Sequence, residues 1–306
     1  MTVARLGVDI CFGKKRWPEP EEWTALVRDR LGLNWVEYDT DFLDPFFVSE
    51  PARSEIAERT RELAAERGLA IHNYYTGTIT HCLNLLSHPD ERVRADGMRW
   101  CREAVALAAK LGARGLGGHF DTICARECAD PELYRRRLDG LVGSMRELSL
   151  TARREGSEFI LLEQMYAPSE APYTFEQTRR LFEEINREAE VPVQLTLDVG
   201  HACCQNFDHQ PRERDPYAWI REFGADAPVI HIHQTTADSS CHWPFTAEYN
   251  SRGIIRPEEV LRALEDSGAG ESLLVLEIFF PLGQTDEQVL EAMRESVEYW
   301  KPWVSL

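Results

Sequence analysis

The sequence lacks the features that mark several large classes of protein. It contains no run of 18 or more apolar residues, so we expect no membrane-spanning helix. Its first residues, MTVARLGVDICFG, lack the order of charged, apolar and small residues found in a secretion signal. None of the eight cysteines belongs to a CxxC pair, and they are spread along 306 residues, unlike the disulfide framework of a small secreted domain. We expect an intracellular, cytoplasmic protein with reduced thiols.

Basic residues are also scarce: 34 Lys and Arg stand against 52 Asp and Glu, which gives a formal charge of −18. This charge repels phosphate backbones and anionic lipids, so we expect neither a nucleic acid nor a membrane as partner. No low-complexity linker or repeat divides the chain. The length and the 43% hydrophobic content fit one large α/β core. We expect a single domain over residues 1–306 that acts on a small molecule.

Short apolar runs alternate with longer amphipathic segments along the whole chain. The expected strands are RLGVDICF, NWVEYDT, LAIHNYY, RGLGGHF, EFILLEQ, VQLTLDV, PVIHIHQ and SLLVLEIFF. The expected helices cover about 20–31, 51–67, 90–111, 131–155, 174–189, 215–223, 256–267 and 285–301. Strict alternation of eight strands with eight helices favours a closed (β/α)₈ TIM barrel over an open sheet. The longest connections follow strands, so the carboxyl ends of the strands should form the functional rim.

The nine histidines collect at this expected rim, and none is expected in a helix. Five lie at or just past the expected carboxyl ends of strands: His72, His119, His201, His231 and His233. The other four, His81, His88, His209 and His242, fall in connections that follow strands. A single histidine at a strand end is usually structural, whereas five that converge on one rim indicate a site.

Three carboxylates, Glu163, Asp198 and Glu277, end apolar strands. Burying such a group costs several kcal/mol unless a cation or strong donors compensate. Strands five to eight are neighbours in a barrel, so these carboxylates and a histidine of strand seven can surround one point. His231 and His233 share a face because strand side chains repeat every two residues, and His233 is nearer the rim. We expect His233 to be a metal ligand, with His231 supporting it from one layer deeper.

Three oxygen donors and one imidazole suit a divalent ion such as Mn²⁺, Mg²⁺ or Co²⁺, and Zn²⁺ also fits. The alternative is a salt-bridge network at the barrel mouth with Lys or Arg as counterions. The strand ends contain almost no basic residues, which favours the metal.

The succession of these residues, with His201 three positions after Asp198, resembles the xylose isomerase-like TIM barrel superfamily, in particular its tagatose and psicose 3-epimerases. The resemblance covers the whole chain in element order. It implies that His201 contacts the substrate and that the two glutamates are the catalytic acid and base. It also implies a metal bound by Glu163, Asp198, His233 and Glu277.

Two positions depart from the sugar epimerases. An Arg six residues after the ligand histidine and a Glu six residues after the first ligand glutamate are replaced by Ser239 and Ser169. Contacts to the far end of the sugar should therefore differ. The segments KKRWPEPEEW and CHWPFTAEYNSRGII resemble the erythrulose 1-phosphate 3-epimerases, which act on a four-carbon ketose phosphate. The expected reaction is 3-epimerisation of a short ketose or its phosphate through an enediolate.

Further substrate contacts are expected from residues around the rim. Sugar hydroxyls would meet His72, Tyr75 and His119. A phosphate would meet the basic run Lys14, Lys15 and Arg16, with Trp17 packed over it, although such a run is also typical of a solvated face. The longest loop would supply an aromatic lid, or alternatively a barrel cap or oligomer contact, from His242, Trp243, Phe245 and Tyr249.

Other functions stay open on the same scaffold. A trinuclear zinc phosphodiesterase of the endonuclease IV type would need an aspartate two residues before His242, where this chain has Ser240. A sugar dehydratase would use similar ligands, and a barrel without catalysis would bind no metal. Family habit and the aromatics Trp300 and Trp303, expected to be exposed, suggest a homo-dimer or homo-tetramer.

Overall fold

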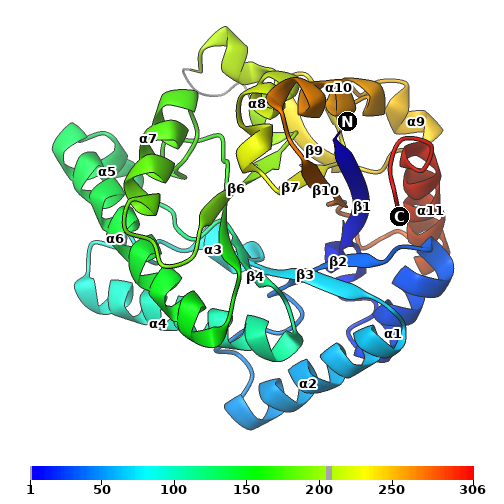
Figure 1. The fold of residues 1–306 in the computed structure, drawn as a ribbon, viewed down its shortest axis with the longest axis horizontal. Coiled ribbons are helices and arrows are strands. Elements are labelled where there is room, and N and C mark those ends of the chain that lie inside the picture. Colours follow the sequence, from blue (N-terminus) through cyan, green and yellow to red (C-terminus); the bar gives the residue numbers. More distant parts are fainter. Residues whose placement is uncertain (1, 205–208) are drawn as a thin grey trace. The chain divides into compact units, whose positions relative to one another are not determined.

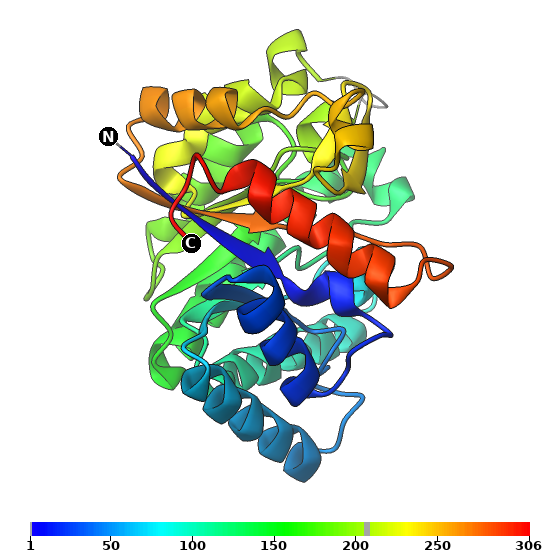
Figure 2. The same ribbon diagram turned by 90° about the vertical axis from the view of Figure 1, so that its right-hand side faces the viewer.

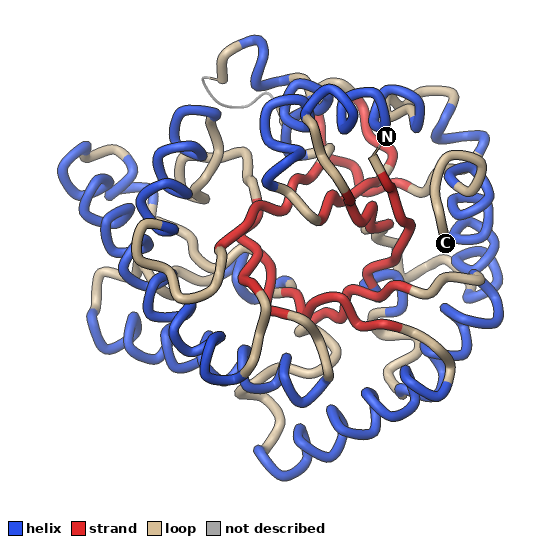
Figure 3. Tube along the Cα trace, in the orientation of Figure 1, coloured by secondary structure: helices blue, strands red, loops and turns tan. Residues whose placement is uncertain are grey.

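Eight parallel strands close into a barrel, as the alternating pattern predicts (Figure 1). The computed structural model describes residues 2–204 and 209–306, so residues 205–208 of the long loop after the sixth strand lie outside it. The strands follow the order β1-β10-β7-β6-β5-β4-β3-β2. Their bounds are β1 Val3–Asp9, β2 Trp35–Asp39, β3 Ala70–Tyr75, β4 Gly115–Gly118, β5 Phe159–Glu163, β6 Val193–Asp198, β7 Val229–Ile232 and β10 Glu271–Leu276. Figure 3 draws these strands in red.

The predicted helices are all present. Asp90 and Asp130 accept backbone N–H groups at the first turns of α4 and α6, and Gly112 and Gly156 end these helices in the left-handed conformation. The helices after the strands are α1 Pro20–Ala25 with its π-helical continuation η2 Leu26–Leu31, α2 Glu50–Glu66, α4 Glu91–Leu111, α6 Pro131–Glu155, α7 Phe175–Asn186, α8 Pro216–Phe223, α10 Pro257–Ser267 and α11 Asp286–Trp300.

The connections after strands contain short elements that the periodicity did not predict. They include a two-stranded antiparallel hairpin, β8 Gln234–Thr236 with β9 Ser239–Trp243. Short helices are α3 Thr78–Cys82, α5 Ala125–Cys128 and α9 Ala247–Asn250. Single 3₁₀ turns are η1 Ile10–Gly13, η3 His201–Cys203, η4 Pro211–Arg214 and η5 Gly224–Asp226. His81 lies in α3, so the prediction that helices contain no histidine is wrong for this residue.

Contacts divide the chain into two compact units. The first comprises residues 1–38, 62–71 and 195–306, and it contains β1, β7, β10, most of β6 and the hairpin. The second comprises residues 39–61 and 72–194, and it contains β4, β5, α4, α6 and α7. The single domain over 1–306 stays a prediction.

The core of the first unit forms where β10 lies between β1 and β7. Val8 pairs with Leu276, and Leu276 pairs with Ile232, in a parallel register. All three side chains are fully buried. The last residues of the chain return to β1, where the Leu6 N–H donates to Ser305 O at 2.8 Å (Figure 2).

Trp300 and Trp303 were both expected to be exposed, but the structure exposes one of them and buries the other. Trp303 is 44% exposed as predicted, but Trp300 is fully buried and packs edge-on against Phe245 with ring centroids 5.3 Å apart. Trp300 therefore belongs to the packing of α11, and the homo-dimer or homo-tetramer stays a prediction. In the described residues, none of the eight cysteines takes part in a disulfide. None of the helices in the described part of the chain combines the length and apolar character that a membrane span requires.

Candidate active site

Three of the predicted ligands lie at the carboxyl ends of adjacent strands in the first unit. Asp198 is the last residue of β6, His233 directly follows β7, and Glu277 directly follows β10. Register explains their common level, since Asp198 pairs with His231 and Ile232 pairs with Leu276. Asp198 and Glu277 were predicted from the cost of burying a carboxylate beside an apolar run, and His233 from its place nearer the rim than His231.

Asp198 and His233 form the most buried pair of this group, at 1% and 0% exposure. Nε2 of His233 lies 3.2 Å from Oδ2 of Asp198. Oδ1 of Asp198 accepts the backbone N–H groups of Gly200 at 2.7 Å and His201 at 2.8 Å. Gly200 is required here because an added Cβ would lie 2.7 Å from Nε2 of His233. The backbone after β6 therefore fixes the carboxylate and leaves room for the imidazole ring.

The β8–β9 hairpin folds His242 back over His233. The two imidazole rings stack with centroids 4.0 Å apart, and the backbone N–H of His242 donates to Nδ1 of His233 at 3.1 Å. His242 has φ = 48°, a left-handed conformation that non-glycine residues rarely adopt outside functional sites. Its Nε2 lies 3.2 Å from the Ser240 hydroxyl. Position 240, where the zinc phosphodiesterases need an aspartate, thus contributes only a hydroxyl.

A second series of contacts joins His231 to two carboxylates. Nδ1 of His231 lies 3.1 Å from Oε2 of Glu277, and Nε2 of the same ring lies 2.8 Å from Oε1 of Glu37. Glu37 and His231 are fully buried. His231 therefore contacts two carboxylates, and the supporting role expected for it stays a prediction. Glu37 was missed, although its place in the apolar strand NWVEYDT is the same signal that identified Glu163.

Asp198 and Glu277 both have a pKa below the ordinary value of their side chains. Burial would raise the pKa of Asp198, but the charges of His201 and His233 hold it well below its ordinary value. Burial likewise opposes ionisation of Glu277, but the charges of His231 and His242 bring its pKa to about 2. Burial lowers the pKa of His242 to about 4, so its ring is neutral at pH 7.

These groups have the chemistry of a divalent-cation site. Donor atoms of Asp198, His231 and Glu277 lie within 4.8 Å of one another, as do those of Asp198, His233 and His242. The ion-pair partners recorded for Asp198 and Glu277 are histidines, not Lys or Arg. This pairing favours metal binding over the salt-bridge network considered from the sequence. His201 lies at the start of η3, with Nε2 4.0 Å from Oδ1 of Asp198.

In the second unit, Glu163 ends β5 and Tyr75 ends β3, as predicted. His119 follows β4, and its Nε2 lies 4.0 Å from Oε1 of Glu170. Glu170 directly follows Ser169 and was not predicted. It is 9% exposed, so the segment after β5 does carry a buried carboxylate, one position later than in the sugar epimerases.

The prediction for His72 is wrong. His72 is the third residue of β3, at the amino end of the strand, and its carbonyl accepts the N–H of Arg114 just before β4. Its ring stacks on Phe159, the first residue of β5, at 5.4 Å. His72 is therefore a packing residue at the opposite end of the strands from the rim.

The basic run after β1 divides into residues with different roles. The guanidinium of Arg16 donates to Gln284 O at 3.0 Å and to Pro281 O at 3.1 Å, and it pairs with Asp286 at 2.8 Å. Arg16 thus fixes the loop before α11. The prediction that it binds a phosphate is wrong. Trp17 is also buried, against Phe12 at 6.0 Å, and does not form an exposed cover. Lys15 is exposed with φ = 66°.

The predicted aromatic lid is only partly present. Phe245 is 1% exposed and stacks on Tyr299 at 5.4 Å, so it caps the packing of α11 instead of covering a substrate. Trp243 and Tyr249 pack together at 5.0 Å, with the Arg252 guanidinium over both rings. Only His242, whose ring lies 4.6 Å from that of Phe279, remains next to the predicted ligands.

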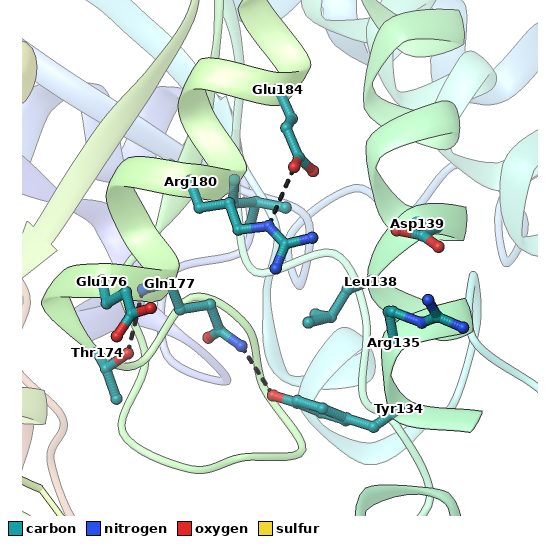
Figure 4. A pocket seen from close by; sticks show the side chains of 10 residues that line it. Tyr134, Arg135, Leu138, Asp139, Thr174, Glu176, Gln177, Arg180 and Glu184 are labelled. Carbon is teal, nitrogen blue, oxygen red and sulfur yellow. Dashed lines mark hydrogen bonds and ion pairs between the residues drawn. The ribbon is translucent and has the colours of Figure 1, made fainter. Parts of the chain in front are cut away.

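A separate cavity of about 340 Å³ lies between α6 and α7 in the second unit (Figure 4). The Gln177 amide donates to the Tyr134 hydroxyl at 2.8 Å across it, and Arg180 pairs with Glu184 on one wall. Its lining contains none of the residues predicted for the site. This groove between outer helices is therefore distinct from the strand-end clusters.

Comparison with known proteins identifies what the chain resembles. Residues 26–303 match the family model described as xylose isomerase-like TIM barrel. D-erythrulose 1-phosphate 3-epimerase of Brucella abortus (strain 2308) is 26% identical over 291 residues, which cover 94% of this chain and 93% of that protein. A crystal structure from Rhodospirillum rubrum ATCC 11170, provisionally assigned as a xylose isomerase, has a TM-score of 0.90 and 26% identity, covering 99% of this chain and 100% of the other. D-psicose 3-epimerase of Clostridium cellulolyticum H10, solved with D-tagatose, has a TM-score of 0.73 and 18% identity over 99% and 100% of the two chains.

Proposed function

The chain belongs to the xylose isomerase-like TIM barrel family, and from this membership we propose that it is a divalent-metal-dependent sugar epimerase or isomerase. The reaction proposed is 3-epimerisation of a short ketose phosphate, with erythrulose 1-phosphate as the first candidate. The observation that carries the proposal is the pair of carboxylates, buried Asp198 and half-buried Glu277, each in contact with a histidine at the carboxyl end of a strand. The relative that acts on erythrulose 1-phosphate supports the choice of substrate.

The proposed metal ligands are Glu163, Asp198, His233 and Glu277. Donor atoms of Asp198 and Glu277 lie within 4.8 Å of each other in one cluster, and those of Asp198 and His233 do so in a second. Carboxylate and imidazole donors of this kind suit Mn²⁺, Mg²⁺, Co²⁺ or Zn²⁺. Glu163 enters the set through strand order, since β5 follows β6 around the barrel. A divalent ion bound here supplies Lewis-acid stabilisation of the negative charge that develops on the substrate oxygens.

Glu163 and Glu277 are the proposed acid and base. Epimerisation removes a proton from the carbon beside a carbonyl and returns one to the opposite face of the resulting enediolate, so it needs two proton carriers. The low pKa of Glu277, about 2, means that this residue is a carboxylate ready to accept a proton at neutral pH. His231 holds that carboxylate at 3.1 Å from below, which fixes its direction.

The remaining proposed contacts surround these two glutamates. His201 orients the substrate carbonyl, and the neutral ring of His242 covers the ligand His233 and excludes water. Tyr75 binds sugar hydroxyls. Lys14 and Lys15 hold the phosphate, a role supported by the exposure of Lys15 and by the commitment of Arg16 to the loop before α11.

Proton exchange followed by NMR tests this function. Metal-loaded protein is incubated in D₂O with a panel of ketoses and ketose 1-phosphates, beside a Glu277→Gln variant. Deuterium at C3 of one tetrulose phosphate, absent with Glu277→Gln, is the expected result. Exchange at another carbon would indicate isomerisation instead. No exchange with any sugar, together with about three zinc ions per chain as in the trinuclear sites, would favour the phosphodiesterase and reject the proposal.

A further inference from the structure

A second cluster of metal-binding side chains lies in the second unit, apart from the ligands proposed above. His81 comes from α3, His119 follows β4, and Glu170 belongs to the connection after β5. One donor atom from each lies within 4.8 Å of the other two. The imidazole rings of His81 and His119 face one another at 4.8 Å with 31° between their planes. Three connections that are distant in sequence thus converge on one point.

The distances are close to those that an ion imposes. A tetrahedral Zn²⁺ ion with bonds of about 2.1 Å separates its donors by about 3.4 Å. Nε2 of His119 and Oε1 of Glu170 are 4.0 Å apart, which is too long for a hydrogen bond. The donors would therefore move by less than about 1 Å to bind an ion, and such a movement is available to His81 because it is exposed.

The surroundings of His119 are already ordered around this point. The Thr76 hydroxyl donates to His119 O at 2.8 Å, and Nε2 of His119 lies 3.3 Å from the Thr122 hydroxyl. His119 and Glu170 are 1% and 9% exposed, so two donors are buried while the third opens to solvent and provides a path of entry. Two imidazoles and one carboxylate form a donor set typical of zinc sites that keep a fourth position for water.

From this geometry we propose that His81, His119 and Glu170 bind a second divalent cation, of the Zn²⁺ class. The site ties α3 to the ends of β4 and β5, and it acts independently of the metal proposed at Asp198. His119 then contributes to cation binding instead of contacting a sugar hydroxyl directly.

Metal counting with matched variants tests the site. Protein stripped with chelator is saturated with Zn²⁺, desalted and analysed for zinc per chain, for the wild type, His81→Ala, Glu170→Gln and the control His88→Ala. His88 is a half-buried histidine outside the cluster, with its Nδ1 accepting the Asp90 N–H at 3.0 Å. We expect His81→Ala and Glu170→Gln to bind one ion fewer than the wild type, and His88→Ala to bind the same number.

The difference in zinc content between wild type and variants tests the second site even if the Asp198 site binds no ion. None of the substitutions changes a residue of the Asp198 site. His81 is exposed, so its truncation should not unfold the chain, and circular dichroism of each variant checks this. A His81→Ala protein that is folded and retains the wild-type zinc content would overturn the proposal.

Discussion

The imidazole of His231 and the carboxylate of Glu37 meet at 2.8 Å in the fully buried interior of the first unit. The other nitrogen of the ring faces Glu277 at 3.1 Å, so His231 lies between two carboxylates. The ring contacts both carboxylates, and this arrangement fixes the direction of the Glu277 side chain. Glu37 acts on the proposed base through His231 and is a positioning residue.

Glu37→Gln should lower kcat by about 10- to 100-fold, the usual cost of removing a group that orients a ligand side chain. The amide keeps the size of the side chain but removes its charge, so Glu277 loses its fixed direction while the substrate contacts remain. KM for the sugar should change by less than kcat. Steady-state rates of Glu37→Gln beside Glu66→Gln, at an exposed position on α2, check this. A kcat equal to that of the wild type would show that Glu37 only fills space.

Gly200→Ala should reduce kcat/KM by about 100-fold, since displacement of a reacting group by about 1 Å has effects of this size. The added methyl would press on His233 and Ser240, which moves the imidazole away from Asp198. Metal affinity, measured by titration calorimetry, should fall in the same variant. Gly143→Ala is the control, because its Cβ meets nothing within 4 Å and alanine favours a helix. Equal metal affinity in the two variants would contradict the prediction.

Arg16→Ala should affect the stability of the protein, whereas Lys15→Ala should affect its binding of substrate. Arg16→Ala removes contacts to Pro281, Gln284 and Asp286, and should lower the free energy of unfolding by about 1–3 kcal/mol. Lys15→Ala should leave stability unchanged but raise KM for a ketose phosphate roughly tenfold, as expected for losing one charge-assisted contact. Urea unfolding and kinetics on both proteins separate the two effects. A rise in KM with Arg16→Ala alone would restore the phosphate role to Arg16.

The Glu127–Arg137 pair should contribute to acid sensitivity. Hydrogen bonds from Arg137, at 2.7 and 2.9 Å, lower the pKa of the nearly buried Glu127. Because the folded pKa is below the unfolded value of about 4.3, the stabilisation is complete above that value and disappears as the pH falls through the folded pKa. Unfolding free energies between pH 7 and pH 3 should fall more steeply for the wild type than for Glu127→Gln. Parallel curves would show that the pair does not couple to folding.

The fold could be predicted because each element has a local signal. Strands and helices differ in hydrophobic period, and Asp90 and Asp130 begin helices by a contact with residues two positions away. The carboxylates at strand ends were predictable for a related reason, since burial of an acid beside an apolar run requires compensation. The same reasoning applied to NWVEYDT would have identified Glu37.

Other features depend on partners that the local sequence does not indicate. His72 is followed by three more strand residues and packs on Phe159 of another strand, a contact that the run LAIHNYY does not indicate. Arg16 looked like an anion-binding residue, but its partners lie in the loop before the last helix. The cluster of His81, His119 and Glu170 forms only when three separate connections meet, and no single segment predicts that meeting.

The pairing of β1 with β10 has a consequence for how the chain acquires its structure. Residues 3–8 are synthesised long before their partners, residues 271–276 and Ser305. One edge of β1 therefore stays unpaired until these later residues have been translated. Closure of such a long loop makes folding slow and leaves the open edge exposed to aggregation and to chaperones.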